Sequence, residues 1–431
     1  MLDTAGVKTD KTRSALALMG GAPAVTEPLP PMYPGAMRIG PEEEEAVLDV
    51  LRSKRLFRRY GPYPGPSRVE ALEGAFAARV RTPYSVAVTS GTAALVCALQ
   101  GCGLGPGDEV IVPAYTWIAP ALAALAVGAV PIIAEVDASL TFDPADVENK
   151  ITNTTKAIVA VHMRGASCNM GELTRIAQQH NLRLLEDVAQ ATGGSYQGRP
   201  LGSIGDAGAF SFQFNKIVTS GEGGMVTTSD PVVYQRAFMY HDMGSSLDRV
   251  PPDHILPGLN FRMPELLGAV ALVQLGRLDG LLEAMRQRKA LLKARMATVA
   301  EQTGVTFRAL NDEQGDAAIA LVFYLPTAER AADTARALRA EGAGAYTLYD
   351  PARGPDYHIY RYWLPILDKR VWSARGGPWR WHSREVTYAE DMCPRTLDLL
   401  ARAVHLDISP ELTERAVDQL AIAINKVLTT L

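Results

Sequence analysis

Short apolar runs alternate with longer helix-like segments through the middle of the chain. The apolar runs are rich in Val, Ile and Leu, as buried strands are. They lie at 85–89, 109–112, 130–135, 157–161 and 182–186. The helix-like segments begin near Thr92, Trp117, Pro144 and Met170. This alternation predicts βα units around a mainly parallel sheet, which is an α/β fold.

A second pattern follows Pro264, where apolar residues recur at helical spacing and predict a long helix. Its apolar positions are Leu267, Val270, Leu278, Leu281, Leu282 and Met285. Beyond it, a strand-like run at 317–324 and helix-like segments near 328–340 and 410–428 predict a smaller α+β domain. We therefore expect three parts, namely an N-terminal arm at 1–40, a large α/β domain at 41–275 and a C-terminal α+β domain at 276–431.

Three residues with chemical potential follow predicted strands. Gly91 lies in the turn after the first run, Trp117 follows the second, and Asp187 follows the run at 182–186. In open α/β sheets, ligands bind beyond the carboxyl ends of the strands. The sequence therefore predicts that these three residues converge at one edge of the sheet.

The charge balance narrows the range of partners. The 431 residues hold 43 basic and 47 acidic side chains, a net charge of -4, so no broad basic field favours nucleic acid or an anionic membrane. The apolar run at 15–19 is shorter than that of a secretory signal, and no stretch approaches a membrane span. The four cysteines form no CxxC pair and the histidines show no HExxH spacing, so we expect no metal site. These features favour a cytoplasmic protein with small-molecule ligands.

Lys216 and Asp187 are the candidates for covalent chemistry. Lys216 lies between Phe214 and Ile217, in an apolar run where an unpaired ammonium is costly. Condensation with an aldehyde removes that cost and creates a reactive imine. Asp187 brings a carboxylate to the rim of the sheet, where it can keep a pyridinium nitrogen protonated. The pair predicts a pyridoxal 5'-phosphate enzyme; the structural alternatives are a surface lysine with a buried stem and an aspartate at a helix N-cap.

The turn Ser90-Gly91-Thr92 leads from a predicted strand into a predicted helix. Backbone amides and hydroxyls in such a turn bind phosphate. A Ser-Gly-Thr turn alone is common, but joined to Ser211 and Lys216 it predicts the phosphate site of the same cofactor. Gln190 follows Asp187 by three residues, so a helical turn would place both side chains on one side.

These residues and their spacing resemble the DegT/DnrJ/EryC1/StrS family of aminotransferases over about 40–394. The resemblance implies the type I fold of pyridoxal-phosphate-dependent transferases, with an internal aldimine on Lys216. In the deoxysugar dehydratases of that family a His replaces this lysine, so the retained Lys216 favours transamination. The resemblance also implies a homodimer, because Asn260 matches a residue that reaches the phosphate of the neighbouring subunit's cofactor.

The resemblance assigns further roles around the cofactor. Ser211 matches a phosphate-binding hydroxyl, Trp117 an aromatic that stacks on the pyridine ring, and Gln190 a contact of the ring hydroxyl. His162 and Arg164 match a recurrent segment and are expected to line the substrate pocket, with a structural hydrogen bond as the alternative for His162. Tyr357 and His358 are expected substrate contacts in an aromatic and basic segment at 357–384, in which the chain departs from shorter relatives by an insertion around 372–381. The alternative there is a solvated surface cluster.

The expected reaction moves an amino group from glutamate or glutamine to a ketosugar or ketocyclitol. Two sets of sequence resemblances point to different ketone substrates. Segments at 20–24 and 211–213 resemble enzymes that aminate scyllo-inosose-type cyclitols or make 3-amino-5-hydroxybenzoate, whereas 56–60 and 161–165 resemble enzymes that aminate eight-carbon keto-octulosonates. The open alternatives are an aminohydroxybenzoate-synthase-like dehydratase and a cofactor-binding regulatory paralogue without activity.

Overall fold

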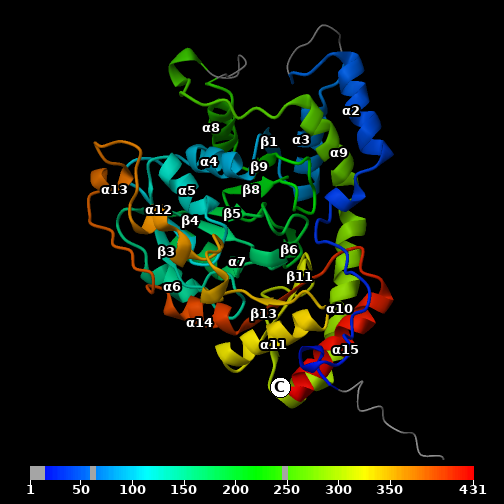
Figure 1. Ribbon diagram of the computed structural model, residues 1–431. Helices are drawn as coiled ribbons and strands as arrows, with labels where there is room; N and C mark the ends of the chain where they lie inside the picture. Colours follow the sequence, from blue (N-terminus) through cyan, green and yellow to red (C-terminus); the bar gives the residue numbers. More distant parts are fainter. Residues whose placement is uncertain (1–14, 59–64, 245–250) are drawn as a thin grey trace, which may run out of the picture.

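A seven-stranded sheet forms the centre of the protein (Figure 1). The computed structural model describes residues 15–58, 65–244 and 251–431. In spatial order the strands are β1 (Tyr84–Val88), β9 (Gly224–Thr228), β8 (Ala207–Ser211), β5 (Arg183–Asp187), β4 (Thr155–Val161), β2 (Glu109–Pro113) and β3 (Val130–Ala134). Within this sheet, β9 alone runs in the opposite direction to the other six strands. The predicted mainly parallel sheet is confirmed.

Helices cover both faces of this sheet. One face carries α4 (Gly91–Gly101), α5 (Ala119–Ala126) and α8 (Pro231–His241), whose buried residues share one apolar cluster. The other carries α3 (Arg68–Val80), α6 (Pro144–Asn149) and α7 (Met170–Gln179), which contribute to a second cluster. Because both faces are covered, β2 and β3 are buried along their whole length, which explains their unbroken apolar sequences.

The long helical pattern after Pro264 forms two helices. They are α9 (Glu265–Gly276) and α10 (Leu278–Thr303), and they meet at Arg277. Gly276 has low helix propensity, and the Arg277 side chain is held by Glu43 and Glu42 at the start of α2 (Pro41–Ser53). Figure 1 shows α10 extending from the large sheet to the C-terminal part.

The C-terminal part is smaller, as predicted. Its antiparallel sheet has the order β10 (Thr306–Phe307), β11 (Ala320–Tyr324), β13 (Ala403–Asp407) and β12 (Tyr346–Thr347). The helices α11 (Ala328–Ala340), α14 (Pro394–Arg402) and α15 (Glu414–Thr430) accompany it. None of the helices in the described ranges is long and apolar enough to cross a membrane.

The segment between β12 and α14 returns to the large sheet. It contains the short helices α12 (Leu364–Leu367) and α13 (Pro378–Trp381). Tyr388 donates its hydroxyl to the Pro131 carbonyl at 2.7 Å, and the Tyr360 amide donates to the Ala114 carbonyl at 2.9 Å. The proposed boundary at 275/276 therefore divides the two sheets. The segment between β12 and α14 nevertheless packs on the large domain, although it lies after that boundary.

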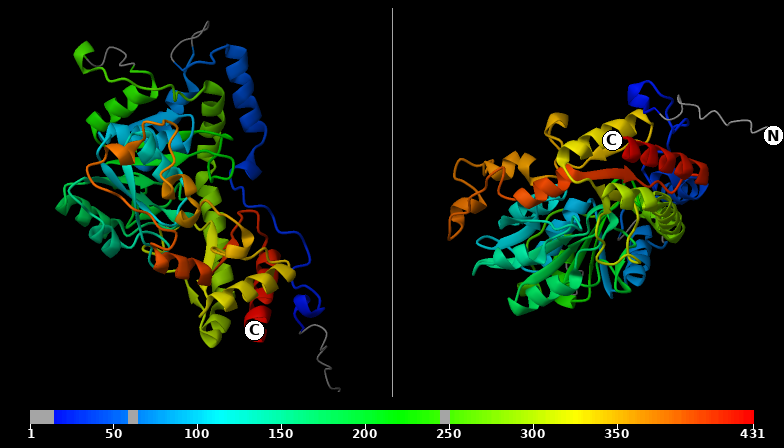
Figure 2. Two further views of the ribbon diagram at one scale, coloured as in Figure 1. Left: turned by 60° about the vertical axis from the view of Figure 1, so that its left-hand side comes forward. Right: turned by 90° about the horizontal axis from the view of Figure 1, so that it is seen from below.

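The N-terminal arm runs along the C-terminal part (Figure 2). Its described residues begin at Ala15, and the Ala17 and Ala24 amides donate to the Glu341 carboxylate at 2.8 and 2.9 Å. The Ser409 hydroxyl donates to the Pro31 carbonyl at 3.0 Å. These contacts hold the part of the arm that precedes α2 against the smaller domain.

Candidate functional site

A cavity of about 320 Å³ opens at the carboxyl ends of β5 and β8, beside the N-terminus of α4. Nine of the predicted site residues line it: Ser90, Gly91, Thr92, Trp117, Asp187, Gln190, Ser211, Lys216 and His358. The predicted convergence of Gly91, Trp117 and Asp187 is confirmed. Asn260, His162, Arg164 and Tyr357 lie outside its lining.

Lys216 lies in the loop between β8 and β9 and is half-buried. Burial lowers the pKa of its amine and the nearby charge of Arg164 lowers it further, while Asp187 and Glu222 oppose the shift. The amine has no hydrogen-bond partner among the residues that the structure describes. It is therefore a comparatively nucleophilic amine, available for a covalent bond with a ligand in the cavity.

Asp187 closes the cavity at the end of β5 and is only 6% exposed. Burial raises the pKa of its carboxyl group, and the Ala189 amide, which donates to Oδ1 at 3.0 Å, opposes this shift together with Lys216 and His162. A turn, not a helix, follows Asp187, so the alternative of a helix N-cap is excluded, and Gln190 does not share a helical face with it. A cationic ring N–H would relieve the burial cost of this carboxylate.

Ser90 caps α4, and its hydroxyl accepts the Ala93 amide at 3.1 Å. Gly91 packs against Ser211, because a Cβ added at Gly91 would lie 2.7 Å from the Ser211 Cβ. The absent side chain thus brings the start of an eleven-residue helix and the Ser211 hydroxyl to the same end of the cavity. Amides at a helix N-terminus together with hydroxyls bind phosphate well.

Trp117 and His358 form the outer wall. The Trp117 side chain is 47% exposed, and its ring centroid lies 5.1 Å from that of His358 and 6.1 Å from that of Tyr357. The His358 Nδ1 lies 2.8 Å from the Asp356 carboxylate. Burial lowers the pKa of His358 and the bond to Asp356 opposes the shift. Tyr357 lies next to the wall, in a neighbouring hollow of about 280 Å³.

His162 is fully buried behind the cavity. Its Nδ1 accepts the Cys168 amide at 3.1 Å, and its Nε2 lies 3.1 Å from the Glu186 carboxylate. Because Nδ1 accepts, Nε2 carries the proton and donates to Glu186. Both ring nitrogens are used, which favours the structural alternative over the expected substrate contact.

The amide oxygen of Gln190 accepts the Arg164 backbone amide at 3.2 Å, so Gln190 fixes the turn after β4. Asn260 is exposed, and its oxygen accepts the Arg262 amide at 3.4 Å. The expected cofactor roles of Gln190 and Asn260 remain predictions.

Sequence reasoning missed several residues of the lining. Thr116, Gln213, Asn215 and Glu222 also line the cavity. The sequence carried a signal for Glu222, which lies in the Gly-rich stretch after Lys216. No sequence pattern marks Thr116, Gln213 and Asn215, which line the cavity because they are adjacent in the chain to predicted site residues.

The lining fits pyridoxal phosphate in chemistry and arrangement. Three groups lie around one cavity. They are the free amine of Lys216, the buried carboxylate of Asp187, which accepts a single amide, and the amides and hydroxyls beside Gly91, where a Cβ would have no room. These groups match the aldehyde, the ring nitrogen and the phosphate of the cofactor. Within the described residues, no group of three His, Cys, Asp or Glu side chains is placed to hold a metal ion.

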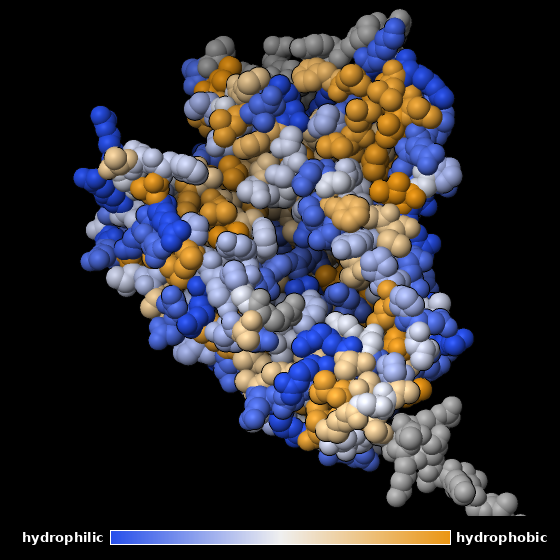
Figure 3. Space-filling view, in the orientation of Figure 1, coloured by the Kyte–Doolittle hydropathy of each residue, from blue (hydrophilic) through white to orange (hydrophobic). Residues whose placement is uncertain are grey.

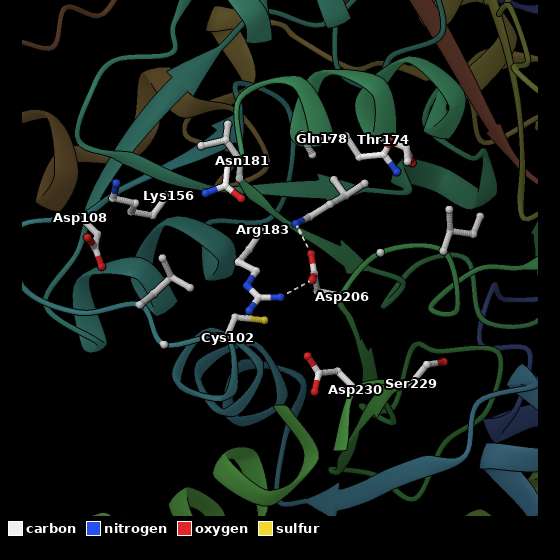
Figure 4. A pocket seen from close by; sticks show the side chains of 17 residues that line it. Cys102, Asp108, Lys156, Thr174, Gln178, Asn181, Arg183, Asp206, Ser229 and Asp230 are labelled. Atoms are coloured by element: carbon white, nitrogen blue, oxygen red, sulfur yellow. Dashed lines mark hydrogen bonds and ion pairs between the residues drawn. The ribbon is translucent and has the colours of Figure 1, made fainter. Parts of the chain in front are cut away.

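A wider hollow of about 1050 Å³ lies at the amino ends of β4 and β5 (Figure 4). Several of its charged groups serve the fold. Arg183 pairs with Asp206 at 2.6 Å, Asp206 also accepts the Leu184 amide at 2.8 Å, and Asp108 accepts the Gly105 amide at 2.9 Å. No predicted site residue lines it. The amino ends of parallel strands are not where such sheets bind ligands.

The fold and the cavity define a type I pyridoxal-phosphate-dependent transferase. Residues 37–362 match the DegT/DnrJ/EryC1/StrS aminotransferase family, and the chain belongs to that family. It is accordingly an aminotransferase.

Named relatives include a cyclitol aminotransferase and a synthase of a nucleotide-linked sugar. Over 306 residues the chain is 39% identical to the L-glutamine:2-deoxy-scyllo-inosose aminotransferase of Streptomyces kanamyceticus. The aligned region covers 66% of this chain and 68% of the relative. It is 37% identical over 247 residues to the GDP-perosamine synthase of Escherichia coli O157:H7, covering 57% of this chain and 66% of the relative.

Solved structures share the fold over nearly the whole chain. The crystal structure of 3-amino-5-hydroxybenzoic acid synthase superposes with a TM-score of 0.77 at 28% identity, covering 94% of this chain and 100% of that one. The structure of DesI in the presence of its TDP-sugar product has a TM-score of 0.75 at 28% identity and covers 97% of each chain.

Proposed function

We propose that this enzyme transfers the amino group of L-glutamine, or of L-glutamate, to a ketone on a cyclitol or sugar, with pyridoxal phosphate bound through Lys216. The observation that carries the proposal is the single cavity that unites Lys216, Asp187, Ser90 and Ser211. The relatives support the substrate class, because the one from Streptomyces kanamyceticus is named for L-glutamine and a scyllo-inosose.

Bound pyridoxal phosphate supplies an electron sink that stabilises negative charge at the α-carbon of the amino donor. The chain's own residues position the cofactor and move the proton. Asp187 would keep the ring nitrogen protonated, and the amides at the start of α4 would hold the phosphate with Ser90 and Ser211. The Lys216 Nζ would take the proton from the donor α-carbon, a role that its lowered pKa favours near neutral pH.

A second copy of the chain is the proposed partner. Apolar residues are exposed on and around α2, including Met37, Ile39, Leu48, Leu51 and Leu56. Figure 3 shows apolar surface at the upper right, where Figure 1 places α2 and α9. Asn260 is exposed outside its own cavity, beside the exposed Leu259. This supports a homodimer in which Asn260 reaches the cofactor phosphate of the partner.

A dehydrating, aromatising reaction is the second candidate. It is favoured by the structural similarity to 3-amino-5-hydroxybenzoic acid synthase over the full length of that chain. An assay with an aminoshikimate-type substrate separates the two candidates. Formation of an aromatic product, absorbing in the near ultraviolet, would favour the second, whereas amination of a ketocyclitol without loss of water would favour the first.

The first experiment is a spectrum of the purified protein with pyridoxal phosphate, followed by additions of L-glutamine and L-glutamate separately. We expect an absorption band of the cofactor joined to Lys216, which each effective donor converts to the amine form. Lys216→Ala should keep the circular dichroism of the fold, lose this band and lose turnover, while Lys156→Ala on the surface should change none of them. A wild-type protein without the band, or an active Lys216→Ala variant, would refute the proposed function.

A further inference from the structure

The segment between α12 and α14 contains a run of cations that lies outside the cavity lining. Residues 369–384, here called the basic segment, hold five Lys or Arg side chains, three Trp and one His, and neither Asp nor Glu. The whole chain carries a net charge of -4, so this run departs from the general balance of the molecule. Cations interleaved with aromatic side chains are typical of surfaces that bind anionic partners.

Buried contacts fix the base of the basic segment at the amino ends of β2 and β3. Glu109, the first residue of β2, is fully buried, and its carboxylate lies 2.9 Å from His382 Nε2 and pairs with Arg384. The Trp379 indole donates to the Tyr388 hydroxyl at 2.9 Å, and that hydroxyl in turn donates to β3. The cavity lies at the carboxyl ends of the strands. The base of the basic segment is therefore fixed on the large domain and lies away from the cavity.

The outer part of the basic segment presents tryptophans to solvent. The Trp372 side chain is 108% exposed, as accessible as in an extended chain, and Trp381 is 60% exposed. Val371, beside Trp372, is also exposed. Figure 3 shows hydrophilic surface at the left, where Figure 1 places α13, so these side chains project among polar neighbours. A projecting Trp gains from contact with a partner that removes its apolar surface from water.

Three cations of the basic segment have no acid to pair with. Within the described part of the chain, no ion pair joins an acid to Lys369, Arg375 or Arg380, whereas the other two cations pair with Asp368 and Glu109. These three charges are therefore available to an anion from outside the chain.

The local charge stays positive when the neighbouring acids are included. Glu385 follows the basic segment and is exposed, so five cations face three acids, namely Asp368, Glu109 and Glu385. At physiological ionic strength, charges more than about 8 Å apart are largely screened from each other. A surface that approaches the basic segment therefore responds to this local excess of cations and not to the net charge of the whole chain.

The projecting shape favours a lipid surface among the anionic partners. Single-stranded nucleic acid is bound in grooves, and a protein partner must offer a pocket that matches the Trp. The interface of a membrane takes up a Trp with flanking cations without a matching shape. A side chain as exposed as Trp372 projects from the surface and does not line a groove.

We propose that the basic segment binds the surface of an anionic membrane. Trp372 enters the headgroup region, and Lys369, Arg375 and Arg380 contact lipid phosphates. The enzyme then lies on the membrane with its cavity at the other end of the strands, open to small molecules. The inference goes beyond the proposed reaction and does not depend on it.

The test measures binding of the full-length protein to lipid vesicles by co-sedimentation. Vesicles of phosphatidylcholine with an equal part of phosphatidylglycerol offer an anionic surface, and vesicles of phosphatidylcholine alone offer a neutral one. The variants are Arg375→Gln/Arg380→Gln and Trp372→Ala. All proteins are measured at physiological and at high salt.

We expect the wild-type protein to bind the anionic vesicles at physiological salt and to be released at high salt. Arg375→Gln/Arg380→Gln should lower the partition coefficient by about 10–30-fold, since each cation near an anionic surface contributes about fivefold. Trp372→Ala should lower it by about tenfold, the effect expected when about a third of a Trp side chain leaves water.

Matched controls separate the basic segment from general surface effects. Arg175→Gln/Arg415→Gln removes two exposed cations elsewhere, and Ile422→Ala truncates an exposed apolar side chain on α15. Both controls should bind as the wild-type protein does, and circular dichroism should show the same fold in every variant.

Four results would overturn the inference. The wild-type protein does not bind anionic vesicles, it binds neutral vesicles equally well, Arg375→Gln/Arg380→Gln binds as the wild type does, or the control with two removed cations loses as much binding. A single-stranded oligonucleotide is measured in parallel. Binding to it and not to the vesicles would assign the basic segment to nucleic acid and also overturn the inference.

Discussion

Asp187 and Glu186 are adjacent carboxylates that the pleat of β5 sends to opposite faces of the sheet. Glu186 accepts the amides of Gly202, Ile204 and Gly205 at 2.6–2.9 Å and contributes to the fold. Asp187 accepts one amide and faces the cavity. Adjacent positions of one strand therefore hold a structural acid, Glu186, and a candidate cofactor ligand, Asp187.

Replacing Asp187 with Asn should lower kcat/KM by about 10²–10³-fold, the typical loss when one preorganised electrostatic contact is removed. The amide keeps the size of the side chain but cannot hold a pyridinium proton. Steady-state kinetics with L-glutamine would measure the loss. Asp333→Asn on the surface of α11 is the control. Activity of Asp187→Asn close to wild type would contradict the assigned role.

The residues whose side chains alone suggest the chemistry could be predicted from the sequence. Lys216, Asp187 and the Ser90 turn carry groups that the cofactor needs, and strand ends place them together. The positions of Arg164 and His162 could not be predicted, since the left-handed turn at Arg164 depends on Arg308 from a distant segment. The sequence around Arg58 likewise gives no sign that its guanidinium pairs with Glu73 in the interior.

At the scale of elements, the start of α2 is held by one buried carboxylate. Glu43 accepts the Gly40 amide at 2.9 Å, so its side chain reaches back to the backbone of the N-cap residue, and it receives hydrogen bonds from Arg277 and Gln274. Burial alone would raise the pKa of Glu43, but the bonds from Arg277, Gly40 and Gln274 outweigh it and hold the pKa at about 2. The capping residue thereby ties α2 to the junction of α9 and α10.

The lowered pKa of Glu43 predicts a pH-dependent stability. Its ordinary value is 4.5, so the contribution is complete above that pH and disappears as the pH falls toward 2. Glu43→Gln should lower the free energy of unfolding by up to about 3 kcal/mol at pH 7, from a shift of 1.36 kcal/mol per pKa unit. Urea unfolding of wild type and variant from pH 7 to pH 3 would measure the gap, which is the difference between their free energies of unfolding.

The gap should be constant above about pH 5 and narrow at lower pH. Glu44→Gln, at the exposed neighbouring position, should show no such gap. A gap that stays constant down to pH 3 would mean that Glu43 acts by packing and not by its charge.

Element prediction succeeded where the apolar pattern was unbroken. The predicted runs match β1 to β5 within two residues at each end. The strands β8 and β9 were missed, because Ala-Gly-Ala-Phe-Ser and Gly-Met-Val-Thr-Thr mix glycine with small and polar residues and carry little strand signal. Their strand form depends on the neighbours β5 and β1.

At the scale of the whole molecule, the proposed dimer makes each active site depend on two chains. Lys216 lies in the cavity, whereas Asn260 is exposed outside it. If Asn260 serves the partner's cofactor, the two residues act in different sites of the same dimer. This arrangement can be tested by complementation.

Mixed dimers of Lys216→Ala and Asn260→Asp chains should recover activity. One site then carries both substitutions and the other carries neither, so about half the activity of a wild-type dimer is expected. Chains with two different tags, purified by both, would provide the mixed species, and each homodimer would be the low-activity control. Mixed dimers no more active than the homodimers would argue against a shared site.

The order of the strands has a consequence for biosynthesis. In the sheet, β1 pairs only with β9, and this pairing brings the Ser90 turn beside the loop of Lys216. The two strands are far apart in the chain, and contacts of long sequence separation form late because the loop between them must close. The nascent chain therefore cannot assemble the cofactor site until β9 has left the ribosome. A shortage of pyridoxal phosphate should accordingly leave the folding of the earlier strands unaffected and act only after this pairing has formed.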